Sequence, residues 1–389
     1  MVQLKASAES EKKCSITLSP EQSLQEAIDN AQTGSVICLT KGRWKEAVSI
    51  NKSITLKGLG NKPEVYTKKT NSVTIYVAKK AGLVTLQNLK VSSYARAYGP
   101  RPIIRGASKL VIDDCVIAQE KESRKWGLLF WLQSKKREGS PDLRISDSLF
   151  TNVGVSIYPT ESSIEARIRD SAISSNSYGF GVGKSRSDKD KLYKGPRAEV
   201  TVKNCLIEGS GDKSEEAGTG VYLADGAKVE MVSSTISNFP EKGFHLFGTG
   251  SATIKGSVIK NNRGNGLTLQ DLSQVTVHGS KITQNQGSGI FISSRSQYPG
   301  SELNEKLLYR YKQLPSNIDA EIEGNRIADN GGYGVVVFTG KCGREKKKEA
   351  IGFWGGVMGA RNRISNNGVA NFCPEELSVL TSKEGGRYP

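Results

Sequence analysis

Four glycines recur at a constant spacing of 23 residues, and this repeat constrains the fold more than any other feature of the chain. The phrases GVYL, GFHL, GLTL and GIFI open at Gly220, Gly243, Gly266 and Gly289. Looser copies open at Gly127, Gly154, Gly179 and Gly334. A period of roughly 20 to 30 residues is typical of a solenoid, in which each repeat packs only on its neighbours.

The pattern inside each repeat alternates with period two over three to five residues, which predicts short β-strands. Each repeat holds three such phrases, so we expect three strands per coil and a parallel β-helix of roughly a dozen coils. We predict an all-β fold with one domain over residues 1–389. Residues 15–34 would supply a strand and a capping helix, 35–370 the coils, and 371–389 a C-terminal cap or tail.

Local signals refine this prediction. Six asparagines, each three residues after a large apolar residue, are expected to stack in line inside the coils: Asn152, Asn176, Asn262, Asn285, Asn330 and Asn367. The N-terminal helix is expected to be capped by Ser19, with Gln22 completing a capping box, and to end at Gly34.

The six cysteines contain no CxxC pair, which disfavours a zinc site or a thioredoxin-like motif. Cys14 with Cys38, and Cys342 with Cys373, lie near the two ends of the chain and are candidate disulfides. Cys115 and Cys205 end strand-like phrases and are interpreted as small buried residues.

The chain of 389 residues carries a net charge of +16, which indicates a polyanionic partner unless the charge serves solubility alone. No apolar run approaches the length of a membrane span. The first residues lack the apolar segment of a secretory signal, and we interpret the chain as the mature form of a secreted, periplasmic or cell-surface protein.

The segment SLQEAIDNAQTGSVICLTKGRWKEAVSINKSITLKGLG, together with the later N-x-G-x-G-I repeats, resembles the pectin-lyase-like superfamily. The resemblance covers nearly the whole chain and is closest in style to carbohydrate-binding and sugar-hydrolase repeat proteins. It implies a right-handed β-helix with a substrate groove along one sheet. It does not select a reaction, because the superfamily contains lyases, hydrolases, esterases, epimerases and non-enzymatic binders.

The strand after each glycine resembles the sheet that forms this groove. Alternation places two columns of side chains on its outer face. The first column is Leu129, Ser156, Gly181, Tyr222, His245, Thr268, Phe291 and Val336. The second is Trp131, Tyr158, Gly183, Ala224, Phe247, Gln270, Ser293 and Phe338. The aromatic members suit stacking on sugar rings, although loops that bury them as satellite core are an alternative.

Four insertions follow this strand and carry eleven of the sixteen excess positive charges, at residues 135–138, 184–197, 295–312 and 341–349. A basic wall beside an aromatic floor favours an acidic polysaccharide. The cations that we predict to bind its carboxylates are Lys184, Arg186, Lys191, Arg197 and Arg295. Nucleic acid is a less favoured partner, with its bases stacked on the same rings.

Tyr222 and His245 occupy adjacent coils of the first column, and we predict that they are the catalytic pair of a lyase-like site. The two columns hold no carboxylate, and Asp225 and Asp271 lie two coils apart, so glycoside hydrolysis is disfavoured. No acidic cluster is present to hold calcium, and no cofactor is expected. The sequence therefore predicts binding of acidic polysaccharide, with β-elimination if the site is catalytic, or else a non-catalytic binder of a glycan or protein.

Overall fold

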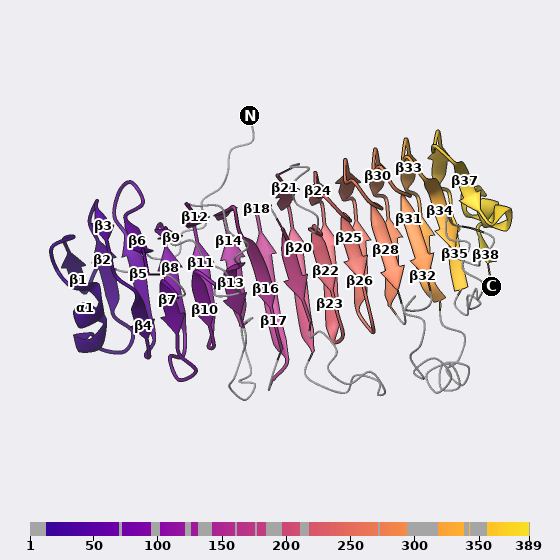
Figure 1. Cartoon of the computed structure of the whole chain (residues 1–389). Helices are drawn as coiled ribbons and strands as arrows, with labels where there is room; N and C mark the ends of the chain where they lie inside the picture. Colours follow the sequence, from indigo (N-terminus) through magenta and orange to yellow (C-terminus); the bar gives the residue numbers. More distant parts are fainter. Residues whose placement is uncertain are drawn as a thin grey trace, which may run out of the picture.

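The computed structural model describes residues 13–69, 72–94, 102–120, 126–130, 142–159, 162–175, 177–183, 197–210, 218–270, 273–293, 318–337, 342 and 356–388. Within these ranges the chain winds into an elongated stack of coils with three long sheets (Figure 1). The predicted all-β, parallel β-helical fold is confirmed. Every pairing of neighbouring strands is parallel except the last one of sheet A, between β35 and β38.

Each coil contributes one strand to each sheet. Sheet A consists of β1 (Ile16–Leu18), β2 (Val36–Leu39), β5 (Ile54–Gly58), β8 (Val84–Gln87), β11 (Leu110–Asp113), β14 (Leu143–Ser146), β17 (Ile164–Arg169), β20 (Ala198–Lys203), β23 (Ala227–Val232), β26 (Ser251–Lys255), β29 (Gln274–His278), β32 (Ile318–Glu323), β35 (Gly356–Ala360) and β38 (Gly386–Tyr388). Sheet B consists of β3 (Arg43–Trp44), β6 (Glu64–Thr67), β9 (Lys90–Ser93), β12 (Val116–Gln119), β15 (Leu149–Thr151), β18 (Ala172–Ser175), β21 (Leu206–Gly209), β24 (Thr235–Ser237), β27 (Val258–Lys260), β30 (Lys281–Thr283), β33 (Arg326–Ala328) and β36 (Arg363–Ser365). Sheet C consists of β4 (Val48–Ile50), β7 (Ile75–Val77), β10 (Ile104–Gly106), β13 (Trp126–Phe130), β16 (Gly154–Ile157), β19 (Phe180–Val182), β22 (Val221–Leu223), β25 (Phe244–Leu246), β28 (Leu267–Gln270), β31 (Ile290–Ser293), β34 (Tyr333–Val337) and β37 (Ala370–Cys373).

The core is a single column of apolar side chains inside the coils. Along β20, the alternate residues Ala198, Val200 and Val202 are buried while their neighbours are more exposed. Because successive side chains of a strand point to opposite faces, the alternation in sequence sends one set inward. One cluster of buried hydrophobic residues runs from Leu18 to Leu380.

A ladder of asparagines fixes the turn between sheet B and sheet C in the C-terminal coils. Asn262, Asn285, Asn330 and Asn367 stack in order, and the amide nitrogen of each of the first three donates to the side-chain oxygen of the next at 2.9–3.0 Å. These four predictions are confirmed, and Asn176 lies outside the described ranges. Asn152 was placed wrongly, because the inward residue of its strand is Phe150 and not Leu149. Asn152 therefore lies one position earlier, at a positive φ of 58°.

A second ladder, which was not predicted from the sequence, occupies the turn between sheet A and sheet B. Backbone N–H groups donate to the side-chain oxygen in the next coil, as from Ser234 to Ser257 and from Ser257 to Ser280. Cys115 and Cys205 occupy the same position in their coils and donate their backbone N–H to Ser148 and Ser234. Both cysteines are buried, as expected, and neither forms a disulfide.

Both ends of the stack are closed. The helix α1 (Leu24–Asn30) lies at one end, and the short 3-10 helix η1 (Glu375–Thr381) lies at the other (Figure 1). The helix is capped by Ser23, which accepts from the Glu26 N–H. The predicted cap at Ser19 was wrong, because the contact of Ser19 with Gln22 holds a turn that precedes the helix. In the described ranges, neither helix has the length and apolar character that crossing a bilayer requires.

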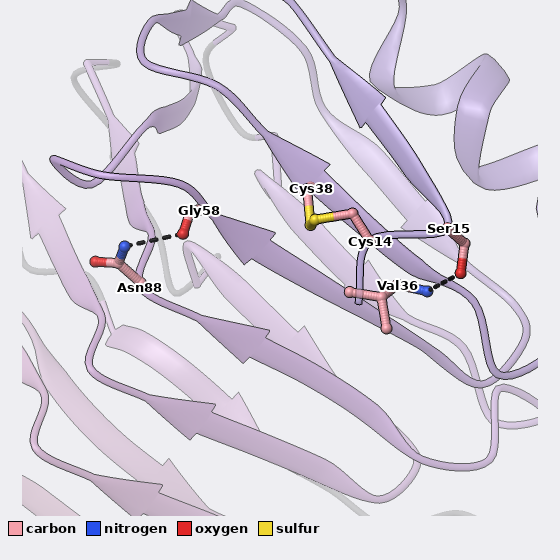
Figure 2. Close-up of a disulfide and its surroundings, with 6 residues drawn as sticks. All are labelled: Cys14, Ser15, Val36, Cys38, Gly58 and Asn88. Atoms are coloured by element: carbon pink, nitrogen blue, oxygen red, sulfur yellow. Dashed lines mark hydrogen bonds between the residues drawn. A yellow bond between two sulfur atoms is a disulfide. The ribbon is translucent and has the colours of Figure 1, made fainter. Parts of the chain in front are cut away.

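The two predicted disulfides are both present. Cys14 is bonded to Cys38 and ties the segment before β1 to β2, where Ser15 Oγ also accepts from the Val36 N–H at 3.0 Å (Figure 2). Cys342 is bonded to Cys373 at the end of β37. Each disulfide therefore fastens chain near one end of the stack to a coil.

Candidate functional site

The outer face of sheet C carries a column of register-matched residues from neighbouring coils. In the strand register, the column runs Ser49, Tyr76, Arg105, Leu129, Ser156, Gly181, Tyr222, His245, Thr268, Phe291 and Val336. All eight residues predicted from Leu129 to Val336 follow one another in this order. The 23-residue spacing predicted correctly that Tyr222, His245, Thr268 and Phe291 follow one another in neighbouring coils. Thr268 and Val336 are nevertheless buried, each with 1% of its surface exposed.

Tyr222 and His245 face outward in adjacent coils. The flanking residues of His245, Phe244 and Leu246, are fully buried on the inner side of the strand, as alternation requires. The ring centroids of Tyr222 and His245 are 5.5 Å apart with an edge-to-face geometry. The predicted pair is thus brought together on the outer face of the coils.

Two further rings extend this pair into an aromatic row. The Tyr178 ring lies 6.3 Å from that of Tyr222, and the Phe247 ring lies 6.4 Å from that of His245, both edge-to-face. Tyr178 is 37% exposed, whereas His245 is only 9% exposed. We call Tyr178, Tyr222, His245 and Phe247 the ring row. Tyr178 precedes the glycine of its repeat, which is why the strand pattern alone did not select it.

His245 has a defined tautomer in this environment. Its Nε2 lies 2.6 Å from Gln270 Oε1 in the next coil. Because a carboxamide oxygen only accepts, Nε2 carries the proton and Nδ1 carries the lone pair. Burial lowers the pKa of the His245 imidazole from 6.5 to about 4, and the positive charge of Lys242 acts in the same direction. His245 is therefore neutral near pH 7, with Nδ1 as its basic atom.

Lys242 is a cation that acts on His245 and that the strand pattern did not predict. It lies in the turn directly before Gly243 and pairs with Glu241, with Nζ 3.1 Å from Oε1. Glu241 also accepts from Thr219 Oγ1 at 3.2 Å in the preceding coil. Lys242 therefore lies in the turn between sheets B and C, close enough for its charge to help lower the pKa of His245. The signal that marks it is its place one residue before the repeat glycine.

The other predicted site residues are distributed along the same face or lie away from it. Tyr158 and Phe291 are half-buried, and Phe291 lies two coils beyond His245 in the first column. Arg197 is exposed directly before β20 of sheet A, where its N–H donates to Ser163 Oγ, and it does not join the ring row. The remaining predicted residues lie outside the described ranges: Trp131, Phe338, Lys184, Arg186, Lys191 and Arg295. So do the four basic insertions, apart from Arg197 and Cys342.

Asp225, considered above as a possible acid, is fully buried. Its Oδ1 accepts from the backbone N–H and the hydroxyl of Thr249 at 2.8 and 3.0 Å. It therefore anchors the turn that follows Phe247, while Asp271 lies outside the described ranges. Across the part of the chain that the structure describes, no three His, Cys, Asp or Glu side chains gather in a geometry that could hold a metal ion.

A polar groove of about 450 Å³ lies on a different face, over β23, β26, β29 and β32 of sheet A. Its charged lining residues are Lys228, Glu230 and Glu321, and it has no aromatic side chain. Negative charge is in excess there, so this groove does not suit an anionic sugar chain. The chemistry-bearing side chains are on sheet C.

Comparison with known proteins agrees with this architecture. The profile described as right handed beta helix region matches residues 138–306 and 192–369. No curated protein sequence matches the chain significantly. Among solved structures, that of the periplasmic alginate epimerase AlgG is similar with a TM-score of 0.52 and 13% identity, over 92% of this chain and 80% of that one. The A-module of the mannuronan C-5 epimerase AlgE6 from Azotobacter vinelandii gives a TM-score of 0.42 and 13% identity, over 90% and 93%. A mannuronic acid specific polysaccharide family 6 lyase from human gut microbiota gives a TM-score of 0.42 and 11% identity, over 84% of this chain and 83% of that one.

The two profile matches overlap and together span more than half of the sequence, in the region that contains the ring row. The chain belongs to the right-handed β-helix family.

Proposed function

We propose that the outer face of sheet C binds an acidic polysaccharide and removes the C5 proton of a uronic acid unit, so that the polysaccharide is cleaved by β-elimination. The observation that carries the proposal is the pair of His245 and Tyr222 rings on the outer face of sheet C, with the charge of Lys242 acting on His245 from the adjoining turn. A neutral imidazole, a phenol and a cation are the three groups that this reaction requires. Aromatic rings on either side offer stacking surfaces for the sugars.

In this mechanism, Lys242 pairs with the carboxylate of the uronic acid and stabilises the negative charge that develops when C5 loses its proton. His245 Nδ1 takes that proton, and Gln270 accepts from Nε2–H, which leaves the lone pair on Nδ1. The electron pair of the C5–H bond forms the C4–C5 double bond, and the C4–O bond breaks. The Tyr222 hydroxyl donates its proton to the leaving oxygen, and the proton on His245 then restores the phenol.

The low pKa of His245 supports this role in part. A base whose pKa is about 4 is already deprotonated at neutral pH, so no fraction of the protein is lost to the protonated form. Its intrinsic basicity is weak, and the nearby cation must therefore supply much of the stabilisation. We place the predicted loop cations Lys184, Arg186, Lys191 and Arg295 in the same proposal, as further contacts to carboxylates along the chain.

Binding without catalysis is the second candidate. The specific observation in its favour is the 9% exposure of His245, which leaves little of the imidazole open to a substrate. In that case Tyr158, Phe247 and Phe291 would serve as stacking platforms, together with Trp131 and Phe338, and Gln270 would act as a polar contact.

We also propose that the protein works outside the cytoplasm. Two disulfides persist best in an oxidising compartment such as the periplasm or the extracellular space. The AlgG structure is described as that of a periplasmic alginate epimerase, which makes alginate the first substrate to test.

The experiment incubates the protein with alginate, polygalacturonate, chondroitin sulfate, heparin and single-stranded DNA at matched ionic strength. Elimination is followed by the ultraviolet absorbance of the new double bond, and the products are identified by mass spectrometry and proton NMR. We expect an unsaturated product from a polyuronate, and a loss of roughly 10²- to 10⁴-fold in turnover for His245→Ala. His278→Ala is the matched control, because His278 is the other histidine and is exposed on sheet A.

The outcomes separate the candidates. Epimerised product without cleavage would support removal of the C5 proton by this site and would contradict the β-elimination step. Binding without any product would favour the non-catalytic role. Preference for DNA over every glycan, or unchanged turnover of His245→Ala, would overturn the proposal.

A further inference from the structure

The first outward column of sheet C extends beyond the residues that the glycine repeat predicts. Tyr76 on β7 and Arg105 on β10 are register partners, and Arg105 in turn pairs with Leu129 on β13. Both side chains are half-buried on the outer face. Their strands follow Thr74 and Ile103 and not a glycine, so the repeat did not reveal them.

Tyr76 and Arg105 form a stacked pair. The guanidinium carbon of Arg105 lies 5.8 Å from the centroid of the Tyr76 ring, within the range of a cation–π contact. Stacking on a ring holds the planar guanidinium in one orientation, so less side-chain entropy is lost when it binds a carboxylate. The pair thus offers an aromatic surface and a preorganised cation in adjacent coils.

The two segments that hold this pair are rich in cations. Residues 72–82 and 102–110 contain Lys79, Lys80, Arg105 and Lys109 and no aspartate or glutamate. Lys79 and Lys80 are exposed directly after β7, and Lys109 is half-buried directly before β11. A cluster of cations of this kind raises the local concentration of an anionic ligand.

The distance to the ring row sets the size of the ligand. Five steps of the column separate Arg105 from His245, through Leu129, Ser156, Gly181 and Tyr222. At about 4.8 Å per step this is roughly 24 Å along the sheet. One step is close to the length of one unit in an extended sugar chain, so a chain of roughly six units would reach both places. The residues midway, Ser156 and Gly181, are small.

We infer that Tyr76 and Arg105 form a distal binding site for the same acidic polysaccharide. A stretch of about six sugar units would reach from this site to the ring row, so the protein selects polymers over short oligomers. This inference rests on the proposed function of the ring row. Arg105 binds a carboxylate and Tyr76 packs against a sugar ring. Occupying both places at once makes the second contact intramolecular, which strengthens binding without any change at the ring row.

The experiment measures binding of size-defined oligouronates by isothermal titration calorimetry, with chains of roughly three and roughly eight units. We expect the longer chain to bind the unaltered protein at least tenfold more tightly. Arg105→Ala should reduce that advantage by about tenfold, because one charge-assisted contact is lost, and should leave binding of the short chain unchanged. The matched control is Arg144→Ala, which removes an exposed arginine from β14 of sheet A.

A second variant guards against misfolding. Lys79→Gln with Lys80→Gln alters only exposed side chains and should also weaken binding of the long chain, while circular dichroism stays unchanged. If both chain lengths bind equally well, or if Arg105→Ala behaves like Arg144→Ala, the distal site is refuted and the proposed function stands. If neither length binds at any accessible concentration, both proposals fall.

Discussion

Lowering the pH should weaken the fold in a window set by His245. The pKa of its imidazole falls from 6.5 to about 4 on folding, because burial disfavours the charged form. Between these two pH values the unfolded chain binds a proton at this position and the folded chain does not, so stability decreases as the pH falls. The contribution is complete above about pH 6.5 and is lost progressively towards pH 4. The difference between the pKa values of His245 in the unfolded and folded states corresponds to about 3 kcal/mol of unfolding free energy, at roughly 1.4 kcal/mol per pH unit.

Two measurements check this prediction. The chain has two histidines, so the proton NMR signals of the imidazole rings can be assigned with a single His278→Ala variant. We expect the His245 signal to titrate with a midpoint near pH 4. Urea unfolding at a series of pH values then compares the two proteins. Between pH 7 and pH 4, the unfolding free energy of the unaltered protein should fall by roughly 3 kcal/mol more than that of His245→Phe.

A His245 signal that titrates between pH 6 and pH 7 would refute this prediction. So would a parallel loss of stability in His245→Phe and the unaltered protein between pH 7 and pH 4. Either result would mean that the His245 imidazole is hydrated in the folded state and not buried by its neighbours. The proposed mechanism would then lose its argument that His245 is fully neutral at physiological pH.

Two further predictions concern the ladders. Asn285→Ala should lower the unfolding free energy by about 3 to 5 kcal/mol, because the buried backbone and side-chain N–H groups of Asn262 lose their acceptor. The exposed Gln286→Ala is the control and should change the unfolding free energy by less than about 0.5 kcal/mol. Urea unfolding measures both. Cys205→Ser should change stability by less than about 1 kcal/mol in the same assay, because serine occupies this ladder position in neighbouring coils and can donate to the Lys203 carbonyl as the thiol does; a larger loss would show that the site depends on the size of sulfur.

The fold was predictable because the repeat carries register information directly. The spacing of 23 residues between Gly220 and Gly243 predicts that the strands after these glycines are neighbours. Period-two alternation predicts which of their side chains face outward. The prediction failed by one residue at Asn152. Leu149 and Phe150 are both large and apolar, and the sequence did not distinguish which of them points inward.

The candidate site was less predictable for two physical reasons. Lys242 and Tyr178 each lie one residue before a repeat glycine, in a turn where strand alternation does not indicate the direction of a side chain. Tyr76 and Arg105 come from coils whose strands do not begin at a glycine, so they were absent from the alignment of repeats. The predicted cations of the insertions have no repeat to constrain them either, and Arg197 was found beside sheet A.

A solenoid assembles such a site in a particular way. Each coil offers sheet C only one or two outward side chains, so no single coil can hold a complete set of reactive groups. Tyr222, His245 and Gln270 come from three successive coils, and their contacts exist only because the coils are stacked without an interruption. The inward residues Phe244 and Leu246 maintain that stack independently of what the outward positions contain. The same core can therefore support a different reaction, or none, after a few outward substitutions, and the chemistry must be argued from the outward columns and not from the fold.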